Sequence, residues 1–198
     1  MSYYIRVLSP SDEQVSVNAL RRNLGDFSLQ IENGTEASWD QLLLSHTSGR
    51  EIAVIERNLV TAASMAEEEI EEFLDEINDL NPVSGADWLR EFLPSVKCIY
   101  AFQILNGADE GDGWSAIGSI KSELWSQLGG IFQADGEGFS NEDGYNIVWQ
   151  FSNNVSGLWW MGLLRDGTWI HFEMELSNAG QRDQYLSGKV PDGVKIAS

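Results

Sequence analysis

The sequence predicts an α+β fold with an N-terminal βαββ unit, central helices and a C-terminal antiparallel sheet. Apolar residues recur at helical spacing in the centre of the chain and alternate with polar ones in its last third, where Asp166-Gly167 separates two apolar runs. A chain of 198 residues is an ordinary size for one core. We therefore expect a single domain over 1–198, with 1–60 as a candidate subdomain and 61–198 as the main body.

The N-terminal third predicts one strand, one helix and three further strands. Turn residues, such as Gly25-Asp26, Asn33-Gly34 and Ser48-Gly49, separate the apolar runs. The expected ranges are 3–8 for the first strand, 15–24 for the helix, and 27–31, 39–45 and 51–57 for the later strands.

The central segment predicts three helices and a buried strand. Ser64 and Glu67 have the spacing of a capping box, and apolar residues from Ile70 to Ile77 then recur at helical spacing until Asn81-Pro82. The further expected helices are 84–92 and 115–128, with an apolar strand over 96–105 between them.

The last third predicts a strand over 145–151, a hairpin of strands 158–164 and 168–177, and a short helix over 181–186. If Asp166 and Gly167 form a two-residue turn, Arg165 lies opposite Thr168 and every later pair is fixed. One face of the hairpin is then apolar and belongs to the core. The other carries aromatic and acidic residues.

The chain has 31 acidic residues against 12 basic ones, a formal net charge of -19. Nucleic acids and anionic membranes are bound by basic surfaces, so this balance argues against both classes of partner. No apolar run reaches membrane-spanning length. An acidic surface suits a basic protein or a cation, or it serves solubility alone.

The single cysteine, Cys98, excludes an internal disulfide framework and lies in an apolar run, where a buried structural thiol is expected. The N-terminal residues lack the pattern of a secretory signal. We expect a protein of a reducing compartment such as the cytoplasm.

The first candidate site is the helix predicted after Ser64, which we call the acidic helix because its many carboxylates have no basic residue among them. Like charges at i and i+4 repel, so a helix that is merely solvated normally includes lysines. The pattern indicates a docking face for a basic partner, with a solvated face as the alternative. The predicted partner-binding residues here are Glu68, Glu72, Asp75 and Glu76.

The second candidate site is the polar face of the hairpin, where Trp160, Trp169, His171 and Glu173 are predicted to bind the partner. Tryptophans beside carboxylates are also typical of sugar-binding and glycoside-cleaving sites. However, Glu173 and Glu175 are neighbours on one strand, whereas such enzymes flank the scissile bond from two sides. A packed second layer is a further alternative.

Two acidic, glycine-rich loops, 106–113 and 135–144, have oxygen ligands of the kind that calcium prefers, but neither has the EF-hand order of residues. Ordinary turns are the preferred interpretation. Two histidines and one cysteine are too few for a usual zinc site, and motifs for nucleotide binding or an activated serine are absent from the sequence. We expect neither a metal nor a cofactor.

Together these observations favour binding over catalysis. The leading hypothesis is an acidic cytoplasmic protein that docks or neutralises a basic protein, in the manner of a toxin-immunity protein. The first alternative is a small carbohydrate-active or other hydrolytic enzyme that uses the Trp/Glu face. The second is a DNA-mimic inhibitor.

Overall fold

The computed structural model describes residues 3–197 and has an α+β fold. It divides into two compact units, which are described separately. The first comprises Met1–Glu67 and Val96–Gly130, and the second comprises Glu68–Ser95 and Ile131–Ser198. The expected division into one domain with a subdomain 1–60 stays a prediction.

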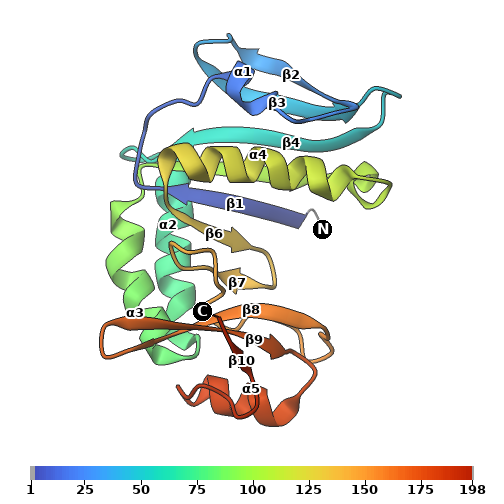
Figure 1. Ribbon diagram of the computed structural model, residues 1–198. Coiled ribbons are helices and arrows are strands. Elements are labelled where there is room, and N and C mark those ends of the chain that lie inside the picture. Colours follow the sequence, from blue (N-terminus) through green and yellow to red (C-terminus); the bar gives the residue numbers. More distant parts are fainter. Residues whose placement is uncertain (1–2, 198) are drawn as a thin grey trace. The chain divides into compact units, whose positions relative to one another are not determined.

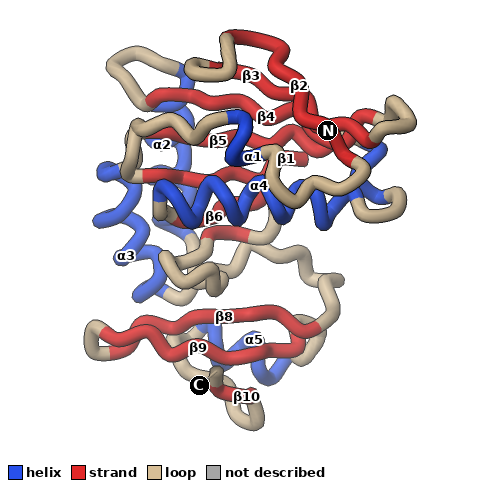
Figure 2. The backbone as a smooth tube through the Cα atoms, turned by 45° about the horizontal axis from the view of Figure 1, so that its top comes forward, coloured by secondary structure: helices blue, strands red, loops and turns tan. Residues whose placement is uncertain are grey.

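The first unit is built on five antiparallel strands in the order β2-β3-β4-β5-β1 (Figure 2). Its elements are β1 (Tyr3–Ser9), α1 (Val17–Leu20), β2 (Phe27–Gly34), β3 (Trp39–His46), β4 (Glu51–Leu59), β5 (Cys98–Ile104), a 3₁₀ turn (Asn106–Asp109) and α4 (Gly113–Leu128). The predicted strands of this unit are all present. The first strand pairs with β5, far along the chain, and not with β2.

The core of the first unit lies between this sheet and helix α4. Phe102 of β5 lies beside Ile55 of β4 and Ile5 of β1 in one row across the sheet, and all three are buried. Helix α4 packs on β1 and β4 (Figure 1). It stops at Gly129, and Gly130 follows with φ 105°, where a Cβ atom would lie 2.1 Å from the carbonyl oxygen of Leu8.

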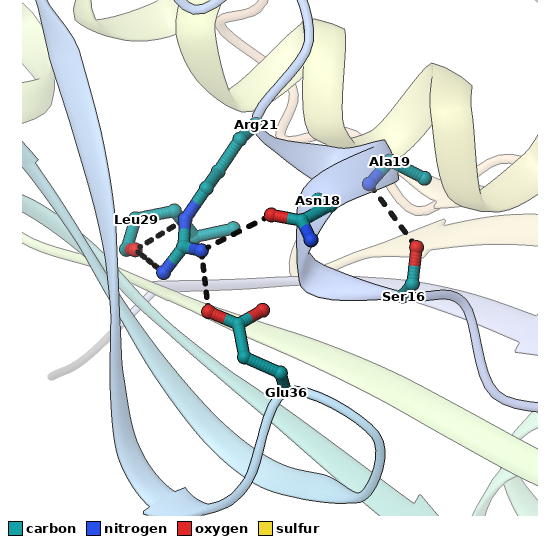
Figure 3. Close-up of polar contacts among 6 residues, drawn as sticks. All are labelled: Ser16, Asn18, Ala19, Arg21, Leu29 and Glu36. Carbon is teal, nitrogen blue, oxygen red and sulfur yellow. Dashed lines mark hydrogen bonds and ion pairs between the residues drawn. The ribbon is translucent and has the colours of Figure 1, made fainter.

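Helix α1 is shorter than the expected 15–24. Ser16 caps its start by accepting a hydrogen bond from the Ala19 amide. Arg21 then reaches away from the helix: its Nε and Nη2 donate to the carbonyl oxygen of Leu29 at 3.1 and 2.9 Å, and its Nη1 pairs with Glu36 (Figure 3). The guanidinium thus ties the end of α1 to β2, and the positive φ of Asn23 (65°) and Gly25 (57°) interrupts the helical turns.

The predicted helix after Ser64 is α2 (Met65–Glu76), followed by a 3₁₀ turn (Ile77–Asp79). The hydroxyl of Ser64 accepts from the Glu67 amide at 3.1 Å, as the capping box requires. The Glu67 carboxylate accepts from the amide of Ala63, one residue before the expected partner. One of the unpaired amides of the first helical turn, that of Glu67, is satisfied in this way.

The second unit carries the C-terminal sheet. Its remaining elements are α3 (Val83–Phe92), a 3₁₀ turn (Leu93–Ser95), β6 (Ile131–Ala134), β7 (Gly138–Phe139), β8 (Leu158–Arg165), β9 (Thr168–Glu175), α5 (Ala179–Leu186) and β10 (Lys195–Ile196). The order of its three-stranded sheet is β10-β9-β8.

The hairpin β8–β9 has the predicted register throughout, from Arg165 opposite Thr168 to Leu158 opposite Glu175. Its apolar face is the core of this unit, where Met161, Phe172 and Met174 are fully buried. Helix α5 lies against this face (Figure 2). The ring centroid of its Tyr185 is 6.1 Å from that of Phe172.

The predicted strand over 145–151 is wrong: this segment forms two isolated bridges, from Asn146 to Ser140 and to Met161. Its backbone groups bond to different partners, since the amide of Trp149 donates to the carbonyl of Asn81. Ile147 and Val148 are both fully buried although they are consecutive. The alternation in the sequence therefore does not correspond to two faces of a strand.

Candidate functional site

The outer face of helix α2 carries the predicted docking residues Glu68, Glu72, Asp75 and Glu76, which we call the α2 carboxylates. All four are exposed, and the opposite face buries Ala66, Ile70, Phe73 and Ile77. Within the second unit, Phe73 packs edge-on against Phe139, with ring centroids 5.2 Å apart. Burial of the apolar face fixes which side chains point to solvent.

The α2 carboxylates have no cationic partner within residues 3–197: no Lys, Arg or His nitrogen lies within 4.0 Å of them. Glu68 and Glu72 are four residues apart, as are Glu72 and Glu76, so like charges face each other along the helix. The arrangement concentrates negative charge at one exposed strip. The four carboxylates form no ion pair inside the described chain.

The hairpin residues Trp160, Trp169, His171 and Glu173 lie on the predicted face of β8 and β9, and we call them the hairpin face. Trp160 is 50% exposed and lies opposite Glu173. Trp169 is partly covered, because its ring packs edge-on against Trp88 of α3, with centroids 5.5 Å apart. Glu173 pairs with Lys195 of β10 at 3.3 Å.

The loop before residue 147 packs on His171 and forms a hydrogen bond with it. Its ring stacks on that of Tyr145, with centroids 3.8 Å apart, and its Nε2 lies 2.9 Å from Nδ2 of Asn141. Burial lowers the pKa of His171 below its usual value, and the carboxylate of Asp143, 3.6 Å away, opposes this only in part. The ring is thus a packed and oriented group.

Two groups of predicted residues therefore exist, and no hydrogen bond or ion pair within residues 3–197 joins them. The α2 carboxylates and Trp160 are open to solvent. Trp169 and His171 are partly buried, because aromatic rings of their own unit pack on them. Sequence reasoning did not find Trp88, Asn141 or Tyr145 as their neighbours. Asn141 and Tyr145 lie in or beside the acidic loop that was considered for calcium.

The carboxylates of the hairpin do not have the properties of a glycosidase pair. The hydroxyl of Ser177 and the amides of Gly157 and Ser177 donate to Glu175, and these bonds lower the pKa of its carboxyl. A general acid needs the opposite shift. Glu173 lies on the same strand and has Lys195 as its partner.

Residues 3–197 contain no group of three or more His, Cys, Asp or Glu side chains placed to hold a metal ion. Cys98 is fully buried, and burial raises the pKa of its thiol to about 11. In the same range, every helix is too short or too polar to span a bilayer.

One feature of the first unit has no counterpart in the sequence analysis. A cavity of about 620 Å³ is lined by the connection between α1 and β2, the turn between β3 and β4, and the start of α4. These three segments are far apart in the sequence and carry no common motif. A local pattern could not have indicated the cavity.

Comparison with known proteins gave no relatives: no family model, no curated protein and no solved structure matches this chain.

Proposed function

We propose that the protein binds a basic protein partner through the α2 carboxylates, as an immunity protein binds a basic toxin. The observation that carries the proposal is that Glu68, Glu72, Asp75 and Glu76 are exposed together with no cation within 4.0 Å in residues 3–197. Each carboxylate is solvated, so little desolvation opposes its meeting with a lysine or arginine of a partner.

The net charge of the whole chain supports the same proposal. A net charge of -19 attracts a basic protein over a long range and raises its association rate, whereas the α2 carboxylates provide the local surface at which the partner would bind. Trp160, half exposed beside Tyr145, offers an aromatic contact of the kind that is enriched in interface hot spots. We assign it a supporting role in the same interaction.

The salt dependence of binding to a small basic ribonuclease tests this proposal. We expect the affinity to fall steeply between low and physiological ionic strength, because the attraction between exposed charges is screened over about 8–10 Å. The same ribonuclease with its lysines acetylated keeps its shape and loses its charge, and serves as the control. Equal affinity for the two forms, or no binding at low salt, would contradict the proposal.

A further inference from the structure

Two Asn-Gly pairs occur in the chain, Asn33-Gly34 and Asn106-Gly107. In such a pair the backbone nitrogen of the glycine can attack the side-chain amide of the asparagine, because glycine has no Cβ to hinder the approach and rotates freely. The two dipeptides are identical, so a difference in reactivity between them in the folded protein comes from the structure around each.

The amide of Gly34 faces the open edge of the first unit's sheet, where β2 is the outermost strand (Figure 1). Thr35 and Ser38 exchange both backbone hydrogen bonds at the end of the β2–β3 hairpin. Antiparallel pairs alternate between bonded and non-bonded, so the next pair, Gly34 with Trp39, exchanges none. The carbonyl of Trp39 accepts instead from Nε2 of Gln14, at 3.1 Å. The nitrogen of Gly34 therefore has no acceptor on β3.

The side chain that this nitrogen would attack is accessible as well. Asn33 and Gly34 are both exposed, and the Asn33 side chain forms no hydrogen bond within residues 3–197. Asn33 also lies between two register shifts in the pairing of β2 with β3. Ring closure requires rotation about the Cα–C bond of Asn33, and an interrupted ladder opposes this rotation less than a regular one.

The pair Asn106-Gly107 is held in place by its surroundings. Gly107 is buried, and a Cβ atom at this position would lie 2.2 Å from the carbonyl oxygen of Glu51, so its backbone packs directly on the start of β4. The amide of Ala108 donates to the carbonyl of Leu105 at 3.0 Å and closes the 3₁₀ turn around the pair. Rotation at Asn106 would have to separate these contacts.

We propose that Asn33 is a site of spontaneous deamidation in the folded protein, whereas Asn106 is protected. Solvent base removes the amide proton of Gly34, and the nitrogen attacks Cγ of Asn33. The new C–N bond closes a succinimide ring, and the side-chain nitrogen regains a proton and leaves as ammonia. Water then adds to either ring carbonyl, breaks its C–N bond and gives aspartate or isoaspartate. The sum of the steps consumes one water and releases one ammonia.

The reaction changes both the charge and the backbone of the outermost strand. Either product carries a carboxylate in place of the amide and adds one negative charge to the net charge of -19. Isoaspartate also inserts a methylene group into the main chain of β2, directly before the hairpin turn. The site requires no partner, so the proposal does not depend on the proposed function of the α2 carboxylates.

Incubation of the whole protein at mildly alkaline pH, folded in one sample and unfolded in guanidinium chloride in the other, tests the proposal. Digestion at acidic pH and mass spectrometry, with fragmentation that distinguishes isoaspartate from aspartate, give the rate at each asparagine. In denaturant both should convert at similar rates. In the folded protein Asn33 should keep its rate within about threefold, and Asn106 should react at least about tenfold more slowly than when unfolded.

Two matched variants assign the reaction. Asn33→Gln keeps the net charge but would have to close a larger and less favourable ring, so the main acidic species that ion exchange separates from the aged folded protein should not form. Asn106→Gln makes the same change at the protected pair and should leave the formation of that species unchanged. If a variant does not fold, the peptide map of the unaltered protein still decides.

Three results would overturn the proposal. The first is that Asn33 stays unmodified in the folded protein although it converts in denaturant. The second is that both asparagines convert at similar rates in the folded protein, which would mean that the dipeptide and not its surroundings sets the rate. The third is that aged Asn33→Gln forms the same main acidic species as the unaltered protein.

Discussion

The imidazole of His171 lies parallel to the ring of Tyr145, with 9° between their planes and 3.8 Å between their centroids. Asn141 fixes the protonation state of this imidazole. Its Oδ1 accepts the amides of Asp143 and Tyr145, so its Nδ2 faces His171 as a donor and Nε2 must accept. Protonation of His171 would place two donors against each other. This contact makes stability depend on pH.

We expect the free energy of unfolding to fall as the pH falls below about 6.5, the ordinary pKa of an unfolded histidine. Burial lowers the pKa of His171 in the folded state, so in this window the unfolded chain binds more protons and is favoured by acid. Urea unfolding at several pH values between about 5.5 and 7.5 measures the slope. His171→Gln should show a shallower slope, and equal slopes would refute the assignment.

Gly162→Ala should destabilise the second unit by about 1 kcal/mol or more. A Cβ atom at this position would lie 3.3 Å from Cγ2 of Ile147 and 3.4 Å from Cδ2 of His171, and both neighbours are held in place. Gly118→Ala, within helix α4, is the matched control: a Cβ there meets nothing within 4 Å, and alanine favours a helix by about 1 kcal/mol. Chemical denaturation should give changes of opposite sign.

Glu72→Lys should stabilise the protein by about 1 kcal/mol, because two repulsive pairs, with Glu68 and Glu76, become attractive. Glu32→Lys changes the net charge equally at an exposed position of β2 and should have an effect within about 0.5 kcal/mol. The midpoint of urea unfolding measures both. Equal stabilisation by the two variants would mean that only the total charge matters and that α2 carries no local repulsion.

Cys98 should not react with a thiol reagent at pH 8 while the protein is folded. It is fully buried, and burial raises the pKa of its thiol to about 11, so neither access nor thiolate is available. Absorbance of the released aromatic thiol after addition of an aromatic disulfide measures the reaction. Labelling should appear only as urea unfolds the chain, and rapid labelling of the folded protein would contradict the placement of this residue.

The accuracy of the sequence prediction differed between elements for physical reasons. The register of the hairpin at Asp166-Gly167 was predicted to the residue, because a two-residue turn fixes the register and alternation fixes the faces. Its strand ends were not, since β9 stops at Glu175 and not at the expected 177. The pairing of β1 with β5 could not be predicted, since local periodicity holds no information on distant partners. The strand predicted over 145–151 is absent because the backbone of this segment bonds to three different neighbours, namely Trp160, Phe139 and Asn81.

The candidate sites divide in the same way. The exposure of the α2 carboxylates follows from the helical period, which the sequence displays directly. The covering of Trp169 by Trp88 and of His171 by Tyr145 depends on tertiary contacts between distant segments. The cavity beside the start of α4 is of this second kind as well.

We propose that the α2 carboxylates, and not the net charge alone, bind a basic protein. One variant replaces them by Gln and Asn: Glu68→Gln, Glu72→Gln, Asp75→Asn and Glu76→Gln. A matched control replaces four exposed acids of the first unit: Glu13→Gln, Glu32→Gln, Asp40→Asn and Glu51→Gln. Each variant changes the net charge from -19 by four, to -15.

The decisive measurement is the Kd of each variant for the basic ribonuclease at one low ionic strength. We predict that the α2 variant binds about tenfold more weakly than the control, because four exposed ion pairs each contribute up to about 1 kcal/mol. Equal Kd values for the two variants would contradict the claim and would leave the acidity of α2 a matter of solubility.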